Sequence, residues 1–159
     1  MEIKEISIDA EKEYIAGYIL QDLPDWFGMP EYTAKYIGDS VTMPFWAAYQ
    51  DQQPIGFAAL KQTSPDTAEI YVMGILKAYH RMGAGTKLYE AFETYAKSRG
   101  YTFVQVKTVQ MGHYGEYDRT NQFYLSMGFR ELECFPTLWD PWNPCQVYVK
   151  YIGNGLERR

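Results

Sequence analysis

The stretch that decides the fold is Ala68-Glu-Ile-Tyr-Val-Met-Gly-Ile-Leu-Lys-Ala-Tyr-His-Arg-Met-Gly-Ala-Gly85. An apolar strand here enters a glycine-bearing turn, and the turn opens an amphipathic run that continues to Arg99. Unpaired backbone N–H groups at the start of a helix form an anion site that suits phosphate. Gly83 and Gly85 lack Cβ atoms, so a phosphate can approach the main chain closely. The pattern therefore predicts a phosphorylated cofactor at residues 81–86.

Two common phosphate-binding patterns do not fit this turn. A P-loop has four residues between its glycines, followed by Gly-Lys-Ser/Thr, whereas a single residue separates Gly83 from Gly85. Thr86 also precedes Lys87, which reverses the P-loop order. A dinucleotide fingerprint needs a third glycine where this chain has Leu88. A purely structural strand–turn–helix corner is the alternative to a cofactor site.

The turn resembles the acetyl-CoA site of the GNAT family of N-acetyltransferases, which places Arg/Gln-x-x-Gly-x-Gly/Ala between a strand and a helix. The matching residues are His80 to Gly85, and His80 departs from the usual first residue, although Arg81 beside it supplies a cation. A second segment, Phe123-Tyr-Leu-Ser-Met-Gly-Phe129, resembles the end of the family's late helix. Two motifs in the right order are more specific than either alone. The resemblance covers residues 44–151 well.

The resemblance implies a reaction as well as a fold. The acetyl group of acetyl-CoA would move to a primary amine by direct attack within a ternary complex. Tyr124 would donate a proton to the leaving thiolate, since a phenol is protonated at neutral pH. Glu69 would be the general base, as in family members that acetylate protein lysines. A core tyrosine and a solvent-facing glutamate are the alternatives, and the fallback carboxylates are Asp25, Glu31 and Glu116.

The predicted cofactor contacts lie on the strand end, the turn and the late helix. A β-bulge near Gly74 would free N–H and C=O groups for the pantetheine arm and the oxyanion. The residues predicted to contact acetyl-CoA are Met73, Gly74, Ile75, Arg81, Met82, Gly83, Ala84, Gly85, Thr86 and Asn121.

The predicted acceptor is a small-molecule primary amine. Aromatic rings and a carboxylate hold a cation well, and the substrate-binding residues predicted on this basis are Trp26, Phe27, Trp139 and Asp140. Three alternatives stay open: acetylation of protein lysine or N-terminal amines, a non-catalytic acyl-CoA sensor on the same fold, and a nucleotide-binding enzyme with a different phosphate loop.

Composition narrows the partners. The chain of 159 residues has a net charge of −5, which disfavours nucleic acid because nucleic-acid binding needs a basic surface. Ten residues separate Cys134 from Cys145 with no histidine nearby, so no metal is predicted. The charged N-terminus and the lack of an apolar run of ~18 residues argue against a signal peptide and a membrane span. We expect a cytoplasmic protein with free thiols, and we allow for a homodimer.

A chain of 159 residues is expected to form one domain, and the resemblance implies that this is a single N-acetyltransferase domain over residues 1–159 with a cofactor-binding core over about 44–151. The fold class is α/β (α+β): a mixed, mostly antiparallel sheet of about six or seven strands flanked by about four helices. Asp9 is predicted as a helix N-cap, and Gly100 and Gly128 as the glycines that end two helices. Strands are predicted at 2–8, 44–50, 54–62, from Thr67, at 101–108, 129–135 and 145–151; helices from Asp9, over 30–37, from Gly83 and over 116–127; and a loop over 136–144.

Overall fold

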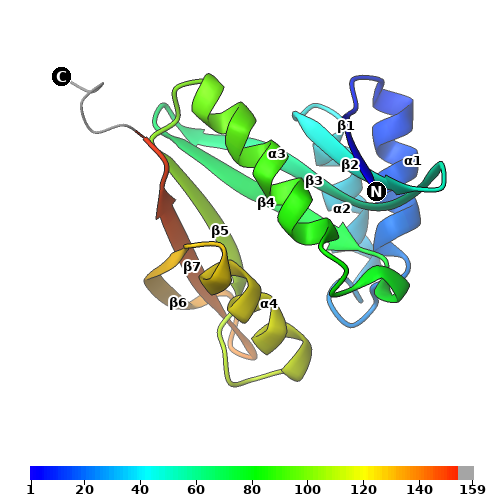
Figure 1. The fold of residues 1–159 in the computed structure, drawn as a ribbon. Coiled ribbons are helices and arrows are strands. Elements are labelled where there is room, and N and C mark those ends of the chain that lie inside the picture. Colours follow the sequence, from blue (N-terminus) through cyan, green and yellow to red (C-terminus); the bar gives the residue numbers. More distant parts are fainter. Residues whose placement is uncertain (154–159) are drawn as a thin grey trace. The chain divides into compact units, whose positions relative to one another are not determined.

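The computed structural model describes residues 1–153, and these residues form one seven-stranded sheet with four α-helices and a short 3₁₀ helix (Figure 1). The strands lie in the order β1-β2-β3-β4-β5-β7-β6, which confirms the predicted fold class. The elements are β1 (Glu2–Glu5), α1 (Asp9–Leu20), α2 (Pro30–Ser40), β2 (Phe45–Gln50), β3 (Gln53–Ser64), β4 (Thr67–Ile75), η1 (Lys77–Tyr79), α3 (Ala84–Ser98), β5 (Phe103–Val109), α4 (Gly115–Ser126), β6 (Arg130–Asp140) and β7 (Asn143–Tyr151).

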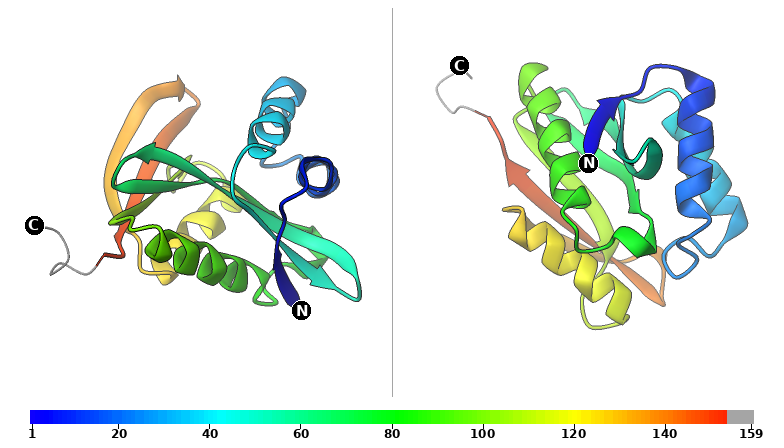
Figure 2. Two further views of the ribbon diagram at one scale, coloured as in Figure 1. Left: turned by 90° about the horizontal axis from the view of Figure 1, so that it is seen from above. Right: turned by 45° about the vertical axis from the view of Figure 1, so that its right-hand side comes forward.

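The chain divides into two compact units, and the first has helices on both faces of its strands. This N-terminal unit comprises Met1–Lys61 and Ile70–Ala96. Phe45 of β2 points into the apolar core shared with α1, whereas the ring of Trp46 lies 5.7 Å from that of Phe92 on α3. Because successive strand residues point to opposite faces, α1 and α2 cover one face and α3 covers the other (Figure 2, left).

The hairpin of β2 and β3 turns on two residues with left-handed backbone. Asp51 has φ 50° and Gln52 has φ 67°, and Gln50 pairs with Gln53 across the turn. Two consecutive positive φ values match the right-handed twist of the flanking strands. The strands predicted at 44–50 and 54–62 are therefore confirmed, and they are joined by two turn residues instead of the three that those bounds leave between them.

The side-chain alternation of β4 slips just before the strand ends. Tyr71 and the adjacent Val72 both pack against the apolar core on the α1 face. A Cβ added to Gly74 would lie 3.0–3.5 Å from side chains of α1 and the loop after it, so Gly74 faces the same way. Ile75 instead approaches Gly56 on the α3 face. Residues three apart in a regular strand point to opposite faces. The shared face of Tyr71 and Gly74 therefore marks an irregularity where the sequence predicts a bulge.

The C-terminal unit, Gln62–Glu69 and the chain from Lys97 onward, is held together by a buried asparagine on α4. Asn121 is 0 % exposed, and its Nδ2 donates to the carbonyl oxygens of Val109 (2.9 Å) and Tyr117 (2.7 Å). Its Oδ1 accepts the hydroxyl of Tyr148 on β7 at 2.5 Å. These bonds tie α4 to β5 and to β7, which pair antiparallel.

Two predicted details near the ends of elements are wrong. Asp9 is not the N-cap of α1: Ile8 occupies that position and makes no side-chain cap hydrogen bond. Asp9 lies one residue later, in the first turn, where its negative charge still favours the positive end of the helix dipole. The first strand also ends at Glu5, three residues before its predicted end.

The predicted loop over 136–144 is wrong as well. β6 continues to Asp140 and β7 begins at Asn143, so Pro141 and Trp142 alone make the turn. Proline in this segment suggested a loop, but β6 is the last strand in the sheet order. A proline on an edge strand loses no ladder hydrogen bond. The pairing with β7 is irregular between Phe135 and Asp140, the stretch that contains Pro136.

Residues 1–153 contain neither a helix suited to crossing a membrane nor a cluster of metal-ligating side chains. Their helices lack the combination of length and apolar character that crossing a bilayer requires. In the same residues, His, Cys, Asp and Glu side chains do not gather in groups of three or more that could hold a metal ion. Cys134 and Cys145 are both free thiols.

Candidate active site

The turn between η1 and α3, here called the phosphate turn (His80–Thr86), reverses the chain with two left-handed residues. Arg81 has φ 64° and Gly83 has φ 88°. A left-handed conformation costs a non-glycine residue roughly 1–2 kcal/mol, so the surrounding structure holds Arg81 in this position. A Cβ at Gly83 would meet no heavy atom within 4 Å, so glycine is favoured there by its backbone conformation.

Backbone N–H groups at the start of α3 are available beside this turn. The N–H of Lys87 donates to the carbonyl oxygen of Gly83 at 3.1 Å, which is the first bond of the helical pattern. The N–H groups of Ala84, Gly85 and Thr86 precede it and have no partner within the helix. The Ala84 side chain is buried and fixes the helix start, whereas Met82 is 61 % exposed. The phosphate turn thus presents amides and a positive helix end, which suit a phosphate.

His80 and Trp26 connect this turn to its surroundings. His80 Nε2 lies 2.7 Å from the carbonyl oxygen of Ile75, at the end of β4. The ring of Trp26, in the loop between α1 and α2, meets the His80 ring edge-on with centroids 5.7 Å apart. One predicted acceptor residue therefore lies directly against the predicted cofactor turn.

Phe27, the second predicted acceptor residue of that loop, begins a row of three contacting aromatic rings, here called the aromatic row (Phe27, Tyr36 and Tyr71). Its ring meets Tyr36 of α2 edge-on at 5.6 Å, and the Tyr36 ring lies 5.3 Å from that of Tyr71 on β4. Phe27 and Tyr36 both pack against the apolar core of the N-terminal unit. Trp26 packs against the same core, but its ring meets His80 of the phosphate turn, whereas the ring of Phe27 meets Tyr36.

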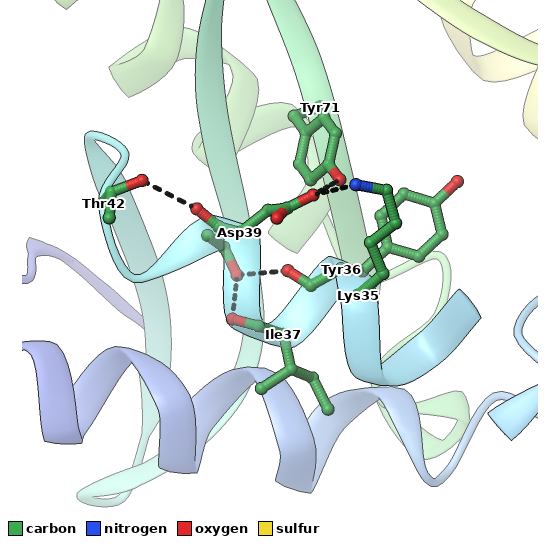
Figure 3. Close-up of polar contacts among 7 residues, drawn as sticks. Lys35, Tyr36, Ile37, Asp39, Thr42 and Tyr71 are labelled. Atoms are coloured by element: carbon green, nitrogen blue, oxygen red, sulfur yellow. Dashed lines mark hydrogen bonds and ion pairs between the residues drawn. The ribbon is translucent and has the colours of Figure 1, made fainter. Parts of the chain in front are cut away.

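A polar cluster that the sequence did not predict lies at the end of this row. Figure 3 shows Tyr71 and Lys35 meeting at the carboxylate of Asp39 on α2. The Tyr71 hydroxyl and the Lys35 ammonium, at 3.0 Å, both donate to Asp39 Oδ2. The hydrogen bond from Tyr71, and then that from Lys35, lowers the pKa of Asp39 below its usual value. The Lys61 ammonium lies 5.5 Å from the Tyr71 ring centre. The spacing of four residues between Lys35 and Asp39 could have predicted their ion pair from the sequence. Their contact with Tyr71 on β4 could not be predicted in this way.

Glu69, the predicted base, is buried and ion-paired. It is 5 % exposed, and its Oε1 lies 3.2 Å from the Lys107 ammonium and accepts a hydrogen bond from Gln105 Nε2 at 3.0 Å. Both partners come from β5. Within residues 1–153 the other carboxylate oxygen, Oε2, accepts no hydrogen bond. The side chain is therefore not the solvent-facing glutamate of the alternative interpretation.

Tyr124, the predicted proton donor, has a packed ring and an unpaired hydroxyl. Its ring contacts those of Phe123, Phe129 and Tyr148 at centroid distances of 5.5–6.3 Å. Burial raises the pKa of Tyr124, so the phenol is protonated at neutral pH. In the described residues every fully shielded side-chain N or O atom has a hydrogen-bond partner. The Tyr124 hydroxyl has no protein partner there, so it keeps contact with solvent.

Comparison with known protein families identifies the family of this chain. The model of the acetyltransferase (GNAT) family matches residues 9–129, about three quarters of the chain. The chain belongs to the GNAT family. The match includes Glu69, the phosphate turn and Tyr124, and it ends before Trp139 and Asp140.

Solved structures share the GNAT fold along nearly the whole chain. A GNAT-family protein from Desulfovibrio desulfuricans superposes with a TM-score of 0.81 at 13 % identity, covering 96 % of this chain and 99 % of its own. An aminoglycoside 6′-N-acetyltransferase solved with coenzyme A gives 0.75 at 17 %, covering 97 % and 98 %. The ribosomal-protein-S18-alanine N-acetyltransferase from Escherichia coli gives 0.72 at 19 %, covering 97 % and 96 %. At these identities the likeness concerns the fold. No curated protein matches the sequence.

The three remaining predicted site residues of this GNAT chain are Asn121, Trp139 and Asp140, and two of them make hydrogen bonds that stabilise the fold. Both Nδ2 bonds and the Oδ1 bond of Asn121 are made inside the protein, so its contacts give no support to a cofactor role. Asp140 accepts from the N–H of Trp142 and from Asn143 Nδ2, which closes the β6–β7 turn. Trp139 is 42 % exposed, and its acceptor role stays a prediction.

Proposed function

We propose that this GNAT protein transfers the acetyl group of acetyl-CoA to a primary amine of a small molecule, by direct attack within a ternary complex. The observation that carries the proposal is the phosphate turn, where left-handed Arg81 and Gly83 precede the free amides at the start of α3. A GNAT neighbour with coenzyme A bound supports the choice of cofactor. The proposed contacts are Met73, Gly74, Ile75, Arg81, Met82, Gly83, Ala84, Gly85 and Thr86.

Each step of the transfer needs a group that this chain can supply. The amine nitrogen attacks the thioester carbonyl carbon after the ammonium has lost a proton, and Glu69 is our candidate for accepting that proton through Oε2. Backbone N–H groups near Gly74 are proposed to stabilise the oxyanion. As the carbon–sulfur bond breaks, the Tyr124 hydroxyl donates its proton to the thiolate. Acetyl-CoA itself supplies the activated acyl group.

A small amine is favoured over a protein tail as the acceptor. Trp26 lies against the phosphate turn and Phe27 begins the aromatic row to Tyr71, so aromatic faces are available to a cationic amine. A protein tail commonly pairs with an exposed strand edge. The comparison that decides is kcat/KM on small amines against kcat/KM on lysine-bearing and alanine-starting peptides. A higher value on peptides would reverse the preference.

The cofactor site is tested by paired substitutions at the two ends of α3. Gly83→Val places a branched side chain at φ 88°, beside the proposed pyrophosphate. Gly100→Val is the matched control, because Gly100 has φ 83° and equally open surroundings beyond the helix C-terminus. Calorimetry should show coenzyme A binding lost or weakened at least about tenfold by Gly83→Val and kept by Gly100→Val. Equal affinity for the two variants would place the cofactor elsewhere.

The ion pair of Glu69 with Lys107 favours one second candidate, a non-catalytic acyl-CoA-binding module. An ammonium at 3.2 Å from Oε1 already satisfies part of the carboxylate that a base would need. This candidate predicts tight coenzyme A binding, no thiol release with any amine and no effect of Tyr124→Phe. The cytoplasmic location, the single domain and the homodimer remain predictions.

A further inference from the structure

The ion pair of Glu69 with Lys107, in the C-terminal unit, leaves one group of each charge open beside the other. Glu69 Oε1 lies 3.2 Å from Lys107 Nζ and accepts from Gln105 Nε2, whereas Oε2 accepts no hydrogen bond from residues 1–153. Glu69 is buried, and in the described part of the chain every fully shielded polar atom of such a side chain has a partner, so Oε2 contacts solvent. One carboxylate oxygen is therefore available to an incoming ammonium.

The Lys107 ammonium is the open group of positive charge. Its contact with Glu69 is an ion pair and not a hydrogen bond, and it donates no hydrogen bond to any residue that the structure describes. An ammonium has three N–H donors. The Lys107 side chain is 38 % exposed, so a ligand can reach these donors from solvent. A carboxylate only accepts hydrogen bonds and is the complementary group.

The ammonium lies over an apolar part of one sheet face. Lys107 pairs with Val147 on β7, and paired residues of neighbouring strands point to the same face. Val109, two residues beyond Lys107 on β5, points that way too. Both valines are buried. They keep water from one side of the ion pair, and charges interact more strongly where water is excluded.

We propose that the acceptor is an amino acid, whose ammonium binds Glu69 Oε2 and whose carboxylate binds the Lys107 ammonium. This inference rests on the proposed acetyl transfer with Glu69 as the base. The two protein charges are in direct contact, so the acceptor must carry its own two charges equally close together. Amino acids do so, because one or two carbon atoms separate their amine from their carboxylate. An acceptor without a carboxylate would leave the Lys107 donors unpaired and bring a second positive charge beside them.

The transfer leaves the carboxylate of the acceptor unchanged. The amine nitrogen bonds to the acetyl carbon as the carbon–sulfur bond breaks, and the products are the N-acetyl amino acid and coenzyme A. One ammonium proton passes to Glu69, and a second replaces the proton that Tyr124 gives to the thiolate. Lys107 transfers no proton and selects the acceptor by its charge. A zwitterion has no net charge, so the net charge of −5 on the chain does not repel it.

The test compares each amino acid with its own amide, which keeps the amine and lacks the negative charge. The common L-amino acids and β-alanine are assayed beside their amides for thiol release from acetyl-CoA. The readout is the ratio of kcat/KM for the acid to kcat/KM for the amide. For the preferred acid we expect a ratio of at least about ten, the contribution of a hydrogen bond between charged groups. The amine of the amide loses its proton more readily, so basicity alone would favour the amide.

Three variants test whether Lys107 causes the preference. Lys107→Met removes the charge at similar length and should bring the ratio to about one, because the charge-assisted bond is lost. Lys107→Arg keeps the charge and should keep a ratio above one. Lys4→Met is the matched control, because Lys4 is also a strand lysine beside a glutamate, with Nζ 3.9 Å from Glu2 Oε1. A general loss of activity affects acid and amide alike, so it does not imitate the expected result.

Several outcomes would overturn the inference. The first needs no variant: wild-type protein that uses no amino acid better than its amide. A ratio that is kept in Lys107→Met would show that another group binds the carboxylate. Thiol release with other amines but with no amino acid would also overturn the inference and leave the proposed acetyl transfer standing. Absence of thiol release with every amine would overturn the proposed acetyl transfer itself, and the inference with it.

Discussion

At the scale of single residues, the two candidate catalytic side chains differ in whether their polar group has a partner. Glu69 is buried with its charge paired to Lys107. Tyr124 has a ring enclosed by other rings, while its hydroxyl is unpaired in the described residues and in contact with solvent. A buried carboxylate needs a partner for its charge, whereas a neutral phenol at the end of an apolar ring does not. The unpaired hydroxyl is the clearer sign of a catalytic role.

Removing that hydroxyl should affect turnover and leave the fold intact. Tyr124→Phe keeps the packed ring and loses only the proton donor. We expect kcat for acetyl transfer to fall about 10²-fold, the usual contribution of a general acid, with coenzyme A affinity unchanged by calorimetry. The free energy of unfolding, measured in urea, serves as the control. An unchanged kcat together with an unchanged fold would show that Tyr124 is a core residue only.

A charge-neutral replacement of Glu69 tests the base. Glu69→Gln keeps the size of the side chain and can still accept from Gln105. If Glu69 accepts the ammonium proton, its loss should slow transfer about 10²-fold at pH 7. The deficit should shrink toward pH 9, because more of the amine then arrives deprotonated. The pH profile of kcat/KM measures this, and a deficit of the same size at both pH values would point to an ordered water as the base.

At the scale of secondary-structure elements, polar side chains join helices to strands in both units. Asn121 fixes α4 to β5 and β7, and Asp39 joins α2 to β4 through Tyr71. The contacts of Asn121 are fully buried, whereas the contact of Tyr71 with Asp39 is only partly buried. Removing the partner of a buried polar group lowers the free energy of unfolding substantially, whereas breaking an exposed pair changes it little.

The buried hydrogen bonds of Asn121 predict that two substitutions lower the free energy of unfolding by different amounts. Asn121→Ala leaves the Val109 carbonyl and the Tyr148 hydroxyl without partners and should lower the free energy of unfolding by about 3 kcal/mol. Tyr148→Phe removes one donor and should cost about 1 kcal/mol. Urea denaturation measures both. Equal costs would mean that Asn121 is not the centre of these hydrogen bonds.

The hydrogen bond between Tyr71 and Asp39 should make a small contribution to the free energy of unfolding, and that contribution should depend on pH. Because the pKa of Asp39 is lower in the folded protein than its ordinary 3.8, this stabilisation is present above that value and is lost as pH falls through the folded pKa. Tyr71→Phe removes the largest cause of the lowering. Its effect on unfolding in urea should therefore be greater at pH 7 than at pH 3. A larger effect at pH 3 would contradict the assigned hydrogen bond.

Elements were predictable from sequence where local signals agree, and less so where tertiary context overrides them. Gly100 and Gly128 end their helices with φ 83° and 95°, as only glycine does readily. The segment over 136–144 was mistaken for a loop because a proline-rich stretch looks the same in a loop and on an edge strand. The strand order that makes β6 an edge is not a local property.

At the scale of the whole molecule, the family and the strand–turn–helix arrangement around the phosphate turn were predictable, whereas the partners of the site residues were not. The phosphate turn is a continuous motif, so its residues could be read together. Lys107 lies 38 residues beyond Glu69, and Tyr71 lies 32 beyond Asp39. Contacts of that kind follow from strand pairing and helix docking. The acceptor is hardest to predict, because its candidate residues belong to separate segments with different surroundings.

Acetyl transfer from acetyl-CoA to a primary amine is the reaction that we propose for this GNAT protein. The most direct measurement is thiol release from acetyl-CoA across a broad amine panel, with coenzyme A binding followed by calorimetry on the same preparation. We predict thiol release that depends on the amine and is strongly reduced in both Gly83→Val and Tyr124→Phe. Coenzyme A binding without thiol release for any amine would leave a binding module. The absence of both binding and thiol release would overturn the proposed reaction.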